Sequence, residues 1–555
     1  MKKKQKVRYS EIIPRHKQWP IVKLSKNRKE FLREVAEESF ENVKQHAKVK
    51  SLREELETTI YREKLRMRAN PWRVDPKDER DFWKHMQHRL VESESASDPH
   101  AAEEQILKDI INRYANEIVG NFKNSYYKFA VGFVTFGFAR LLNAARVKGF
   151  TSLFSRQLDL DDKLHVTGET EQIRKLAKIG TVVMVPTHFS NLDSILIGWV
   201  IQHLGLPAFI YGAGLNLFNI KIFAYFMNSL GAYKVDRRKK NPVYLETLKT
   251  YSSMALRWGC HSLFFPGGTR ARSGQLESSL KLGLLSTAIE AQRIMYQERF
   301  DKAKKIFIVP VTLNYQFTLE APILINDHLK RTGQERYYKE SDEFSTSYKI
   351  GTFLLKFFTK GSDISVTIGK GMDILGNFVD DEGHSYDQNN NHIHPRDYFV
   401  ANGNITIDPQ REQTYVRILS KRIVEEYYKI HRVFSSHIAA YTAFKMLQRQ
   451  NPKLDLYSLM RVPDEDLILD YEEFRKKWKD IRKQIKKLNK KAQVGIENDL
   501  LLKSDEAIRI GLENIGMYHA QRPLTKKENK IIINDPATLF YYHNRLEGYG
   551  LEKHI

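Results

Sequence analysis

Val182-Val-Met-Val-Pro-Thr-His-Phe-Ser-Asn-Leu-Asp193 links two different apolar patterns in this chain. The β-branched run Thr181–Val185 predicts a buried strand, and the apolar spacing of Leu192–Leu204 predicts a helix. Asp193 then falls in the first helical turn, where backbone N–H groups and the helix dipole favour an ionised carboxylate. The stretch therefore predicts a strand, a short loop and a helix, with polar side chains at the carboxyl end of the strand.

His188 and Asp193 form a candidate catalytic pair, because a carboxylate can hold an imidazole in one tautomer and stabilise its protonated form. The spacing alone is weak: with 18 histidines in the chain, about one such match is expected by chance. A second match, His392 and Asp397, lies in an Asn-rich polar tract, whereas His188 follows a predicted strand. No G-x-S-x-G motif accompanies the pair, so His188 would activate a hydroxyl of the substrate for direct transfer.

A purely structural interpretation of the same residues is the alternative. Ser190 or Asn191 can cap the predicted helix through its side chain. In that case Asp193 only complements the helix dipole and His188 is a loop histidine without a catalytic role.

A second strand, loop and helix pattern lies downstream. The apolar run Ser262–Phe265 leads into Pro266-Gly-Gly-Thr-Arg-Ala-Arg-Ser-Gly274, and helical apolar spacing follows over Leu280–Ile294. Adjacent glycines leave backbone N–H groups open to an anion, and the guanidinium groups of Arg270 and Arg272 suit a phosphate. The Walker spacing G-x-x-x-x-G-K-[ST] is absent. The pattern predicts an anion-binding loop; its alternative is a tight turn with solvated charges.

Gly231-Ala-Tyr-Lys-Val-Asp-Arg-Arg238 ends another short apolar segment with paired arginines. Its alternative is again a turn with solvated charges. Three such segments, each at the end of an apolar run, favour one site built from Arg237, Arg238 and the two regions above.

In order and spacing these segments resemble the conserved blocks of the glycerolipid acyltransferases. His188–Asp193 is similar to the first block, Gly231–Arg238 to the second, Phe265–Gly274 to the third and Ile306–Leu313 to the fourth. Within the family the chain is most similar to the bacterial membrane-bound glycerol-3-phosphate acyltransferase. The segments that carry this closer likeness are Gly212–Leu217, Lys281–Gly283 and Phe540–Leu546.

The resemblance implies a general base at His188, oriented by Asp193, acting on the sn-1 hydroxyl of glycerol 3-phosphate. The acyl donor would be acyl-CoA or acyl carrier protein, with no covalent acyl-enzyme, no cofactor and no metal. The residues implied to bind the acceptor are Arg237, Arg238, Gly268, Thr269, Arg270, Arg272 and Lys281.

One departure from the family pattern bears on the acceptor. The family's third block normally carries Glu before Gly-Thr-Arg, and this chain has Gly267 there; Ala271 replaces a common Ser. Because that acid helps to position the acceptor in the family, lysophosphatidate or another glycerol-like alcohol stays open as acceptor. A catalytically silent module that binds anionic lipid is a further alternative.

The net charge and the motifs of the chain indicate which kind of binding partner it has. The 555 residues include 90 Lys plus Arg and 67 Asp plus Glu, a net charge of +23. A basic surface attracts nucleic acid or anionic lipid headgroups. Zinc-finger spacing, RNP-like aromatic blocks and a basic zipper are absent, so no nucleic-acid partner is predicted.

The chain is expected to be a peripheral membrane protein on the cytoplasmic face of the cell membrane. The single cysteine, Cys260, fits a reducing compartment, and Met1–Lys6 lacks the apolar core of a secretory signal. No run of apolar residues reaches the roughly 18 residues that a membrane-spanning helix needs. Phe129–Ala139 and Phe218–Leu230 are the candidate membrane-contacting segments. A buried helix is the alternative for the first, and a place in the acyl groove is the alternative for the second.

Five regions follow from these patterns. Residues 1–104 form a charged helical region with a linker or exposed loop at Glu92–Glu104, and residues 105–164 are helical. An α/β acyltransferase domain, a mixed sheet flanked by helices, covers 165–375, a polar loop 376–409 and a helical C-terminal domain 410–555. The loop's His384, His392 and His394 lack zinc-ligand spacing, so no metal site is predicted. The expected strands are Thr181–Val185, Pro207–Tyr211, Ser262–Phe265, Ile306–Leu313 and Ile364–Ile368.

Overall fold

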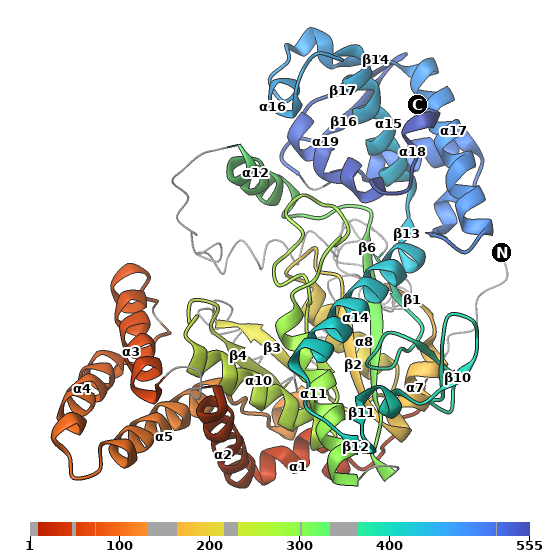
Figure 1. Cartoon of the computed structure of the whole chain (residues 1–555). Coiled ribbons are helices and arrows are strands. Elements are labelled where there is room, and N and C mark those ends of the chain that lie inside the picture. Colours follow the sequence, from red (N-terminus) through yellow and green to blue (C-terminus); the bar gives the residue numbers. More distant parts are fainter. Residues whose placement is uncertain are drawn as a thin grey trace.

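A central seven-stranded sheet organises the computed structural model (Figure 1), which describes residues 9–46, 51–72, 74–129, 164–215, 231–299, 302–333, 364–517 and 519–555. The strand order is β1-β7-β6-β2-β5-β3-β4. Strands β6, β2, β5, β3 and β4 run parallel to one another, whereas β7 is antiparallel to β6 and β1 is parallel to β7. The strands are β1 (Leu164–Gly168), β2 (Thr181–Pro186), β3 (Ile210–Gly214), β4 (Ala232–Val235), β5 (Ser262–Leu263), β6 (Ile306–Tyr315) and β7 (Ile364–Ile368). The predicted mixed sheet is confirmed.

Both faces of the sheet are covered by helices, which explains the unbroken apolar run of β2. Val182 and Met184 pack into the same core as helices α7 and α8, while Val183 and Val185 pack into a core with α11 and α14. In a parallel strand that helices cover on both faces, every side chain is buried, so apolar and polar residues do not alternate. These helices are α7 (Thr170–Ile179), α8 (Asp193–His203), α10 (Pro242–Arg257), α11 (Leu282–Arg299), α12 (Ala321–Thr332) and α14 (Pro409–Ile430).

The parallel strands bring the sequence motifs to one edge of the sheet. His188, Arg237, Gly267 and Glu320 follow the carboxyl ends of β2, β4, β5 and β6, respectively, within two to five residues. Ligands of α/β folds gather at such an edge. The prediction that the motifs converge on one rim agrees with this topology.

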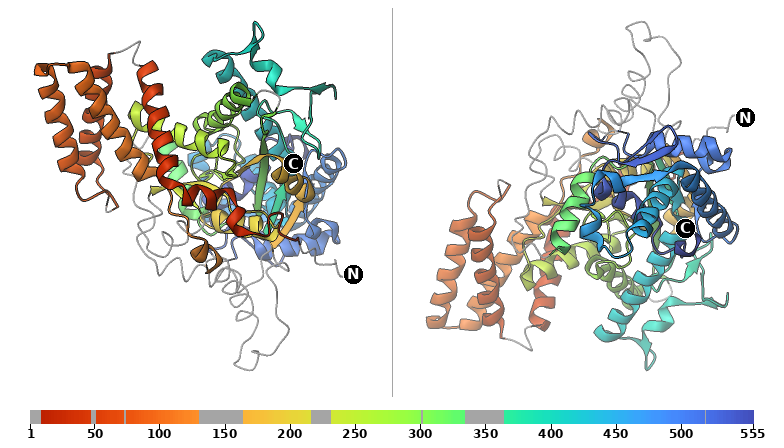
Figure 2. Two further views of the ribbon diagram at one scale, coloured as in Figure 1. Left: turned by 90° about the horizontal axis from the view of Figure 1, so that it is seen from below. Right: turned by 90° about the horizontal axis from the view of Figure 1, so that it is seen from above.

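The N-terminal helices extend to one side of the sheet domain (Figures 1 and 2) and pack on α10. They are η1 (His16–Gln18), α1 (Pro20–Lys26), α2 (Arg28–His46), α3 (Leu52–Ala69), α4 (Glu79–Glu92), η2 (Ser93–Ser95) and α5 (Pro99–Ile118). The expected linker or exposed loop at Glu92–Glu104 is shorter in the structure, because α5 already begins at Pro99. Asp98 caps it by accepting the N–H of Ala101 at 2.9 Å, and a proline at the first helical position needs no N–H partner.

The C-terminal region packs around the buried helix α15 (Ser435–Gln450). The prediction of a mainly helical region missed a three-stranded antiparallel sheet, β14-β17-β16, whose strands are only three or four residues long. The helical apolar spacing of Thr414–Gln448 is divided between α14 and α15 by β13, which pairs with β15. The remaining elements are β13 (Arg432–Val433), α16 (Leu456–Leu459), η8 (Asp464–Leu467), β14 (Ile468–Asp470), α17 (Tyr471–Lys490), β15 (Gly495–Ile496), η9 (Asn498–Leu501), α18 (Ser504–Asn514), β16 (Leu524–Lys527), β17 (Lys530–Ile533), α19 (Pro536–His543), η10 (Asn544–Leu546) and η11 (Glu552–His554).

The polar tract between the two regions has more regular structure than a flexible loop. Asp387 accepts the N–H groups of Asn389 and Asn391 at 2.9 and 2.8 Å, so the Asn-rich sequence forms a side-chain-stabilised turn between short strands. These elements are β8 (Phe378–Val379), β9 (Ser385–Tyr386), β10 (His392–Ile393), η7 (Pro395–Phe399), β11 (Val400–Ala401) and β12 (Asn404–Ile405). Among the described residues, no group of three or more His, Cys, Asp and Glu is placed to hold a metal ion.

The predicted membrane-contacting segments Phe129–Ala139 and Phe218–Leu230 lie outside the described residues, except for Phe129. Across the ranges that the structure describes, none of the helices combines the length and the apolar character that crossing a bilayer demands.

Candidate active site

His188 and Asp193 are in direct contact at the carboxyl end of β2. Nδ1 of His188 lies 2.8 Å from Oδ2 of Asp193. The His188 side chain is 18% exposed and that of Asp193 is fully buried. An ionised Asp193 accepts the Nδ1 proton, so Nε2 is the imidazole nitrogen that can take a proton from a substrate. The predicted pair has the geometry of a general base with its orienting carboxylate.

Asp193 also fixes the loop that carries the histidine. Its Oδ2 accepts the backbone N–H groups of Phe189 and Ser190 at 2.6 and 2.9 Å, and its Oδ1 accepts the hydroxyl of Tyr315. The expectation that Ser190 or Asn191 caps α8 is wrong: Leu192 holds the N-cap position, and no side chain caps it. The first-turn carboxylate bonds back to the loop instead, and this holds the loop in one conformation.

The glycine loop packs directly against His188. The imidazole stacks on the ring of Phe265 with 4.2 Å between centroids, and the backbone N–H of Ala271 donates to the carbonyl of His188 at 2.7 Å. Segments about 80 residues apart in sequence therefore form one site, as the order of the motifs predicts.

Two glycines of this loop are required by its shape. Gly268 has a φ of +77°, and a Cβ there would lie 3.0 Å from Cγ of Lys281. Gly274 has a φ of +81°, and its Cβ would lie 2.1 Å from the carbonyl oxygen of Tyr541. Both values of φ strongly favour glycine. The backbone N–H of Lys281 donates to the carbonyl of Pro266 at 2.7 Å, which returns the chain over the loop.

The arginines of the glycine loop differ in their surroundings. Arg270 is 13% exposed, and its Nη1 lies 3.8 Å from Oε1 of Glu320, a carboxyl that also accepts the N–H of Asn191 at 2.9 Å. Arg272 pairs with the buried Asp327 of α12 at 2.5 Å. Arg270 is thus linked to the histidine loop through Glu320, whereas Arg272 is held by α12. The other two predicted binding residues of this segment, Thr269 and Lys281, are exposed.

The paired arginines after β4 also have different surroundings. Arg237 is exposed. Arg238 is only 6% exposed and forms ion pairs with Asp75 and Asp236, donates to the carbonyl of Asn70 at 2.9 Å, and stacks over the ring of Trp72 at 4.0 Å. These contacts favour a role for Arg238 in docking the N-terminal helices; its predicted role in acceptor binding stays a prediction.

Four residues at the site escaped the list of predicted site residues: Tyr315 and Arg545, which are buried, and Glu277 and Glu320, which are half-buried. Tyr315 is the last residue of β6, so its position at a strand end was a usable signal. Arg545 lies in Phe540–Leu546, a segment that carries the family likeness, and this was a second signal. Glu277 and Glu320 gave none, because a single Glu in a charged chain is normally on the surface. Burial raises the pKa of Glu320, and so does the negative charge of Asp193.

The C-terminal region contributes directly to this site. The Arg545 guanidinium lies 3.4 Å from the centroid of the Phe189 ring and donates to Oγ1 of Thr318 at 3.3 Å. Nδ2 of Asn544 donates to the carbonyl of Ser273 in the glycine loop at 2.8 Å. Residues near the end of the chain therefore support both loops of the site.

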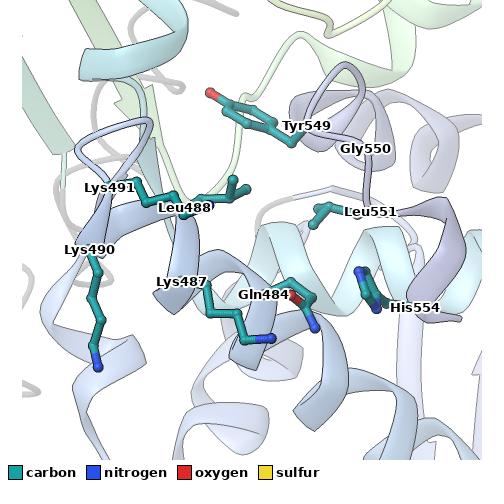
Figure 3. Close-up of a pocket in the computed structure, with 9 residues that line it drawn as sticks. All are labelled: Gln484, Lys487, Leu488, Lys490, Lys491, Tyr549, Gly550, Leu551 and His554. Atoms are coloured by element: carbon teal, nitrogen blue, oxygen red, sulfur yellow. The ribbon is translucent and has the colours of Figure 1, made fainter.

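A cavity of about 470 Å³ lies elsewhere, in the C-terminal region (Figure 3). None of the predicted site residues lines it. Its walls come from α17 and the last residues of the chain: Gln484, Lys487, Leu488, Lys490, Lys491, Tyr549, Gly550, Leu551 and His554.

Comparisons with known proteins agree with the geometry. The acyltransferase family model matches residues 165–314. Glycerol-3-phosphate acyltransferase of Aeromonas hydrophila is 31% identical over 175 residues, 31% of this chain and 20% of that protein. The protein of that name from Haemophilus influenzae (strain PittEE) is 32% identical over 153 residues, 27% of this chain and 18% of that protein.

A further match is longer than this domain. Glycerol-3-phosphate acyltransferase of Shewanella sp. (strain ANA-3) is 25% identical over 292 residues, 51% of this chain and 32% of that protein. The matches therefore span between about a fifth and a third of the length of these curated relatives. The chain therefore contains an acyltransferase domain at residues 165–314, and it is similar in part of its length to bacterial glycerol-3-phosphate acyltransferases.

Proposed function

We propose that the chain transfers a fatty acyl group from acyl-CoA or acyl carrier protein to the sn-1 hydroxyl of glycerol 3-phosphate. The observation that carries this proposal is the His188–Asp193 contact beside a glycine loop that presents Arg270. A base that can take a hydroxyl proton and a cation that can hold a phosphate are the two elements that acyl transfer to a phosphorylated alcohol needs.

The reaction follows from the orientation of His188. Nε2 takes the proton of the acceptor hydroxyl while the oxygen attacks the thioester carbonyl carbon. Asp193 stabilises the imidazolium that forms. The carbon–sulfur bond then breaks, the ester is released, and the thiolate takes the proton from the imidazolium. The thioester is already activated, so this route uses no metal, no cofactor and no acyl-enzyme.

Acceptor binding is proposed for the loops around the pair. Arg270 is the principal phosphate ligand, because its guanidinium is planar, bidentate and linked to the histidine loop through Glu320. Arg237, Arg238, Gly268, Thr269, Arg272 and Lys281 complete the proposed binding set.

The proposed location is the cytoplasmic face of the cell membrane, as a peripheral protein. The net charge of +23 suits a surface rich in anionic lipid, and the acylated product is itself lipid-like. Vesicle flotation should show binding to anionic vesicles that weakens as salt rises; equal binding to neutral vesicles would contradict it.

A panel of donors and acceptors tests the activity. Purified protein is given labelled acyl-CoA or acyl carrier protein, with glycerol 3-phosphate or lysophosphatidate as acceptor, and the labelled product is identified. The expected product is 1-acyl-glycerol 3-phosphate. Consumption of lysophosphatidate alone would reassign the acceptor. Vesicle binding without turnover of any thioester would make the chain a silent lipid-binding module.

Arg270→Ala is expected to raise the KM for glycerol 3-phosphate by about 10- to 100-fold, the range for losing a charge-assisted hydrogen bond to a ligand. The KM for the acyl donor should change far less. Arg509→Ala is the matched control, because Arg509 is an exposed arginine of α18 that pairs with Glu513. An unchanged acceptor KM in Arg270→Ala would remove Arg270 from the phosphate site.

A further inference from the structure

The space beside Gly267 is occupied by the side chain of Glu277. A Cβ at Gly267 would lie 3.1 Å from both Cγ and Oε1 of Glu277. Unlike Gly268, Gly267 does not have a positive φ, so its backbone could carry a side chain. The place that a side chain of residue 267 would fill therefore holds a carboxyl from ten residues later in the chain.

Glu277 binds the backbone of the histidine. Its Oε1 accepts the N–H of His188 at 3.1 Å, while the carbonyl of His188 accepts the N–H of Ala271 at 2.7 Å. Both backbone polar groups of His188 are thus held by the segment 267–277. Together with the stacking on Phe265, these contacts fix the imidazole against the glycine loop.

The carboxyl of Glu277 is buried among charged and titratable groups of three other elements. They are Asp193 of α8, Tyr427 and Tyr428 of α14 and Arg545 of η10. Its Oε2 is buried and has no hydrogen-bond partner among the described residues. Burying a carboxylate with one unbonded oxygen lowers the free energy of unfolding, so its presence calls for an explanation such as a functional role.

We propose that Glu277 is a positioning residue for acyl transfer: its carboxylate holds the backbone of His188 from the place beside Gly267. The inference rests on the proposed function, because it assigns Glu277 a role only through His188. A charged acceptor strengthens the hydrogen bond from the His188 N–H, so the ionised form is the active one.

Glu277→Gln keeps the shape and an oxygen acceptor but removes the charge. We expect kcat at pH 8 to fall about tenfold with both KM values unchanged, since tenfold corresponds to about 1.4 kcal/mol, the margin by which a hydrogen bond to a charged group exceeds a neutral one. Burial raises the pKa of Glu277 to about 7. At pH 6 the wild-type carboxyl is mostly protonated, so the ratio of wild-type to variant kcat should shrink toward one.

The Glu277→Gln substitution should lower kcat at pH 8 but should not lower the stability of the protein. Because the folded state binds the Glu277 proton more tightly than the unfolded state, this group lowers stability as pH rises from about 4.5 to about 7. Glu277→Gln removes that loss, so its thermal midpoint at pH 8 should equal or exceed that of the wild type. A lower kcat together with an undiminished midpoint separates positioning from a merely structural role.

Glu426→Gln is the matched control. Glu426 is also a buried glutamate whose pKa is raised by burial, and its Oε1 accepts a backbone N–H, that of Lys370, at 3.3 Å. Its carboxyl bonds to Lys370 and not to His188, and we expect the kcat of Glu426→Gln to stay within about twofold of wild type at both pH values.

Moving the carboxylate between positions gives the sharpest test. Glu277→Gly should lose about 100-fold in kcat, the effect of leaving the His188 N–H without its acceptor. The double variant Gly267→Glu with Glu277→Gly should recover at least about tenfold of that loss, because the new side chain starts where Glu277 now lies.

Two outcomes would overturn the inference. The first is a kcat of Glu277→Gln that equals the wild-type value at both pH 6 and pH 8. The second is no recovery of kcat in a double variant that folds with a wild-type thermal midpoint. Both leave the proposed function standing if His188→Ala is inactive in the same assay. If His188→Ala is active, the proposed function itself fails.

Discussion

His188→Ala is expected to lower kcat/KM for acyl transfer by about 10³-fold or more, the contribution of a general base in an acyl-transfer site. The imidazole is the group whose Nε2 can take the acceptor's proton, and its Nδ1 is already held by Asp193. The measurement is the initial rate of labelled-acyl transfer to glycerol 3-phosphate at saturating donor.

Asp193→Asn should show a comparable loss for a different reason. The amide cannot stabilise an imidazolium, and it can favour the wrong tautomer of His188. Because Asp193 also accepts two backbone N–H groups of the loop, the circular dichroism and thermal midpoint of this variant must be compared with wild type.

His392→Ala is the matched control for the histidine. His392 has the same spacing to an aspartate, Asp397, but lies exposed on β10. Its activity should equal that of wild type. Near-wild-type turnover in His188→Ala would remove the mechanism.

Arg238→Ala is expected to lower the free energy of unfolding by about 3–5 kcal/mol, the usual effect of removing one partner of a buried ion pair. The substitution removes the guanidinium that pairs with Asp236 and leaves Asp75 with Arg66 alone, at 3.4 Å, in a site where the side chains of Arg238 and Asp236 are each only 6% exposed. Urea unfolding followed by tryptophan fluorescence suits the measurement, because Trp72 lies against the Arg238 guanidinium.

Arg237→Ala is the comparison for stability, because Arg237 is the exposed neighbour on the same loop. Its free energy of unfolding should change by less than about 1 kcal/mol, the usual limit for a surface charge. A stable Arg238→Ala protein with a raised KM for glycerol 3-phosphate would instead place Arg238 in the acceptor site.

The buried ion pairs at Arg238 belong to a larger network that joins the N-terminal helices to the sheet domain. Lys239 is buried and pairs with Glu117 of α5 at 2.5 Å, and Asn241 donates to Glu63 of α3 at 2.7 Å. The loop after β4 is thus fixed by contacts with three N-terminal helices or their connections. Sequence reasoning assigned no role to residues 1–104, and the structure gives them this one.

The parts of the fold that are local in sequence were predictable. Ile364–Ile368 was predicted as a strand with the observed bounds, and Thr181–Val185 and Ile306–Leu313 each fell short by one or two residues. Their signal is a run of β-branched and apolar residues that only a strand covered on both faces accounts for. Strands of two to four residues, such as those of the polar tract and the C-terminal sheet, carry too little periodicity to be recognised.

The sequence by itself determined the identity and spacing of the proposed catalytic pair. A strand, a loop and a helix start place His188 and Asp193 within five residues, so their contact depends on local geometry alone. The glycines at 268 and 274 likewise mark backbone conformations that the residue type reveals.

Only the tertiary structure decided which charged side chains belong to that pair's surroundings. Glu277, Glu320 and Arg545 approach from separate parts of the chain, and Arg238, adjacent to Arg237 in sequence, turns away to bind the N-terminal helices. The type of a charged residue indicates which groups its side chain can bind, but it does not indicate whether that side chain is buried. Burial, which sets the strength of each of these interactions, is a property of the packed chain.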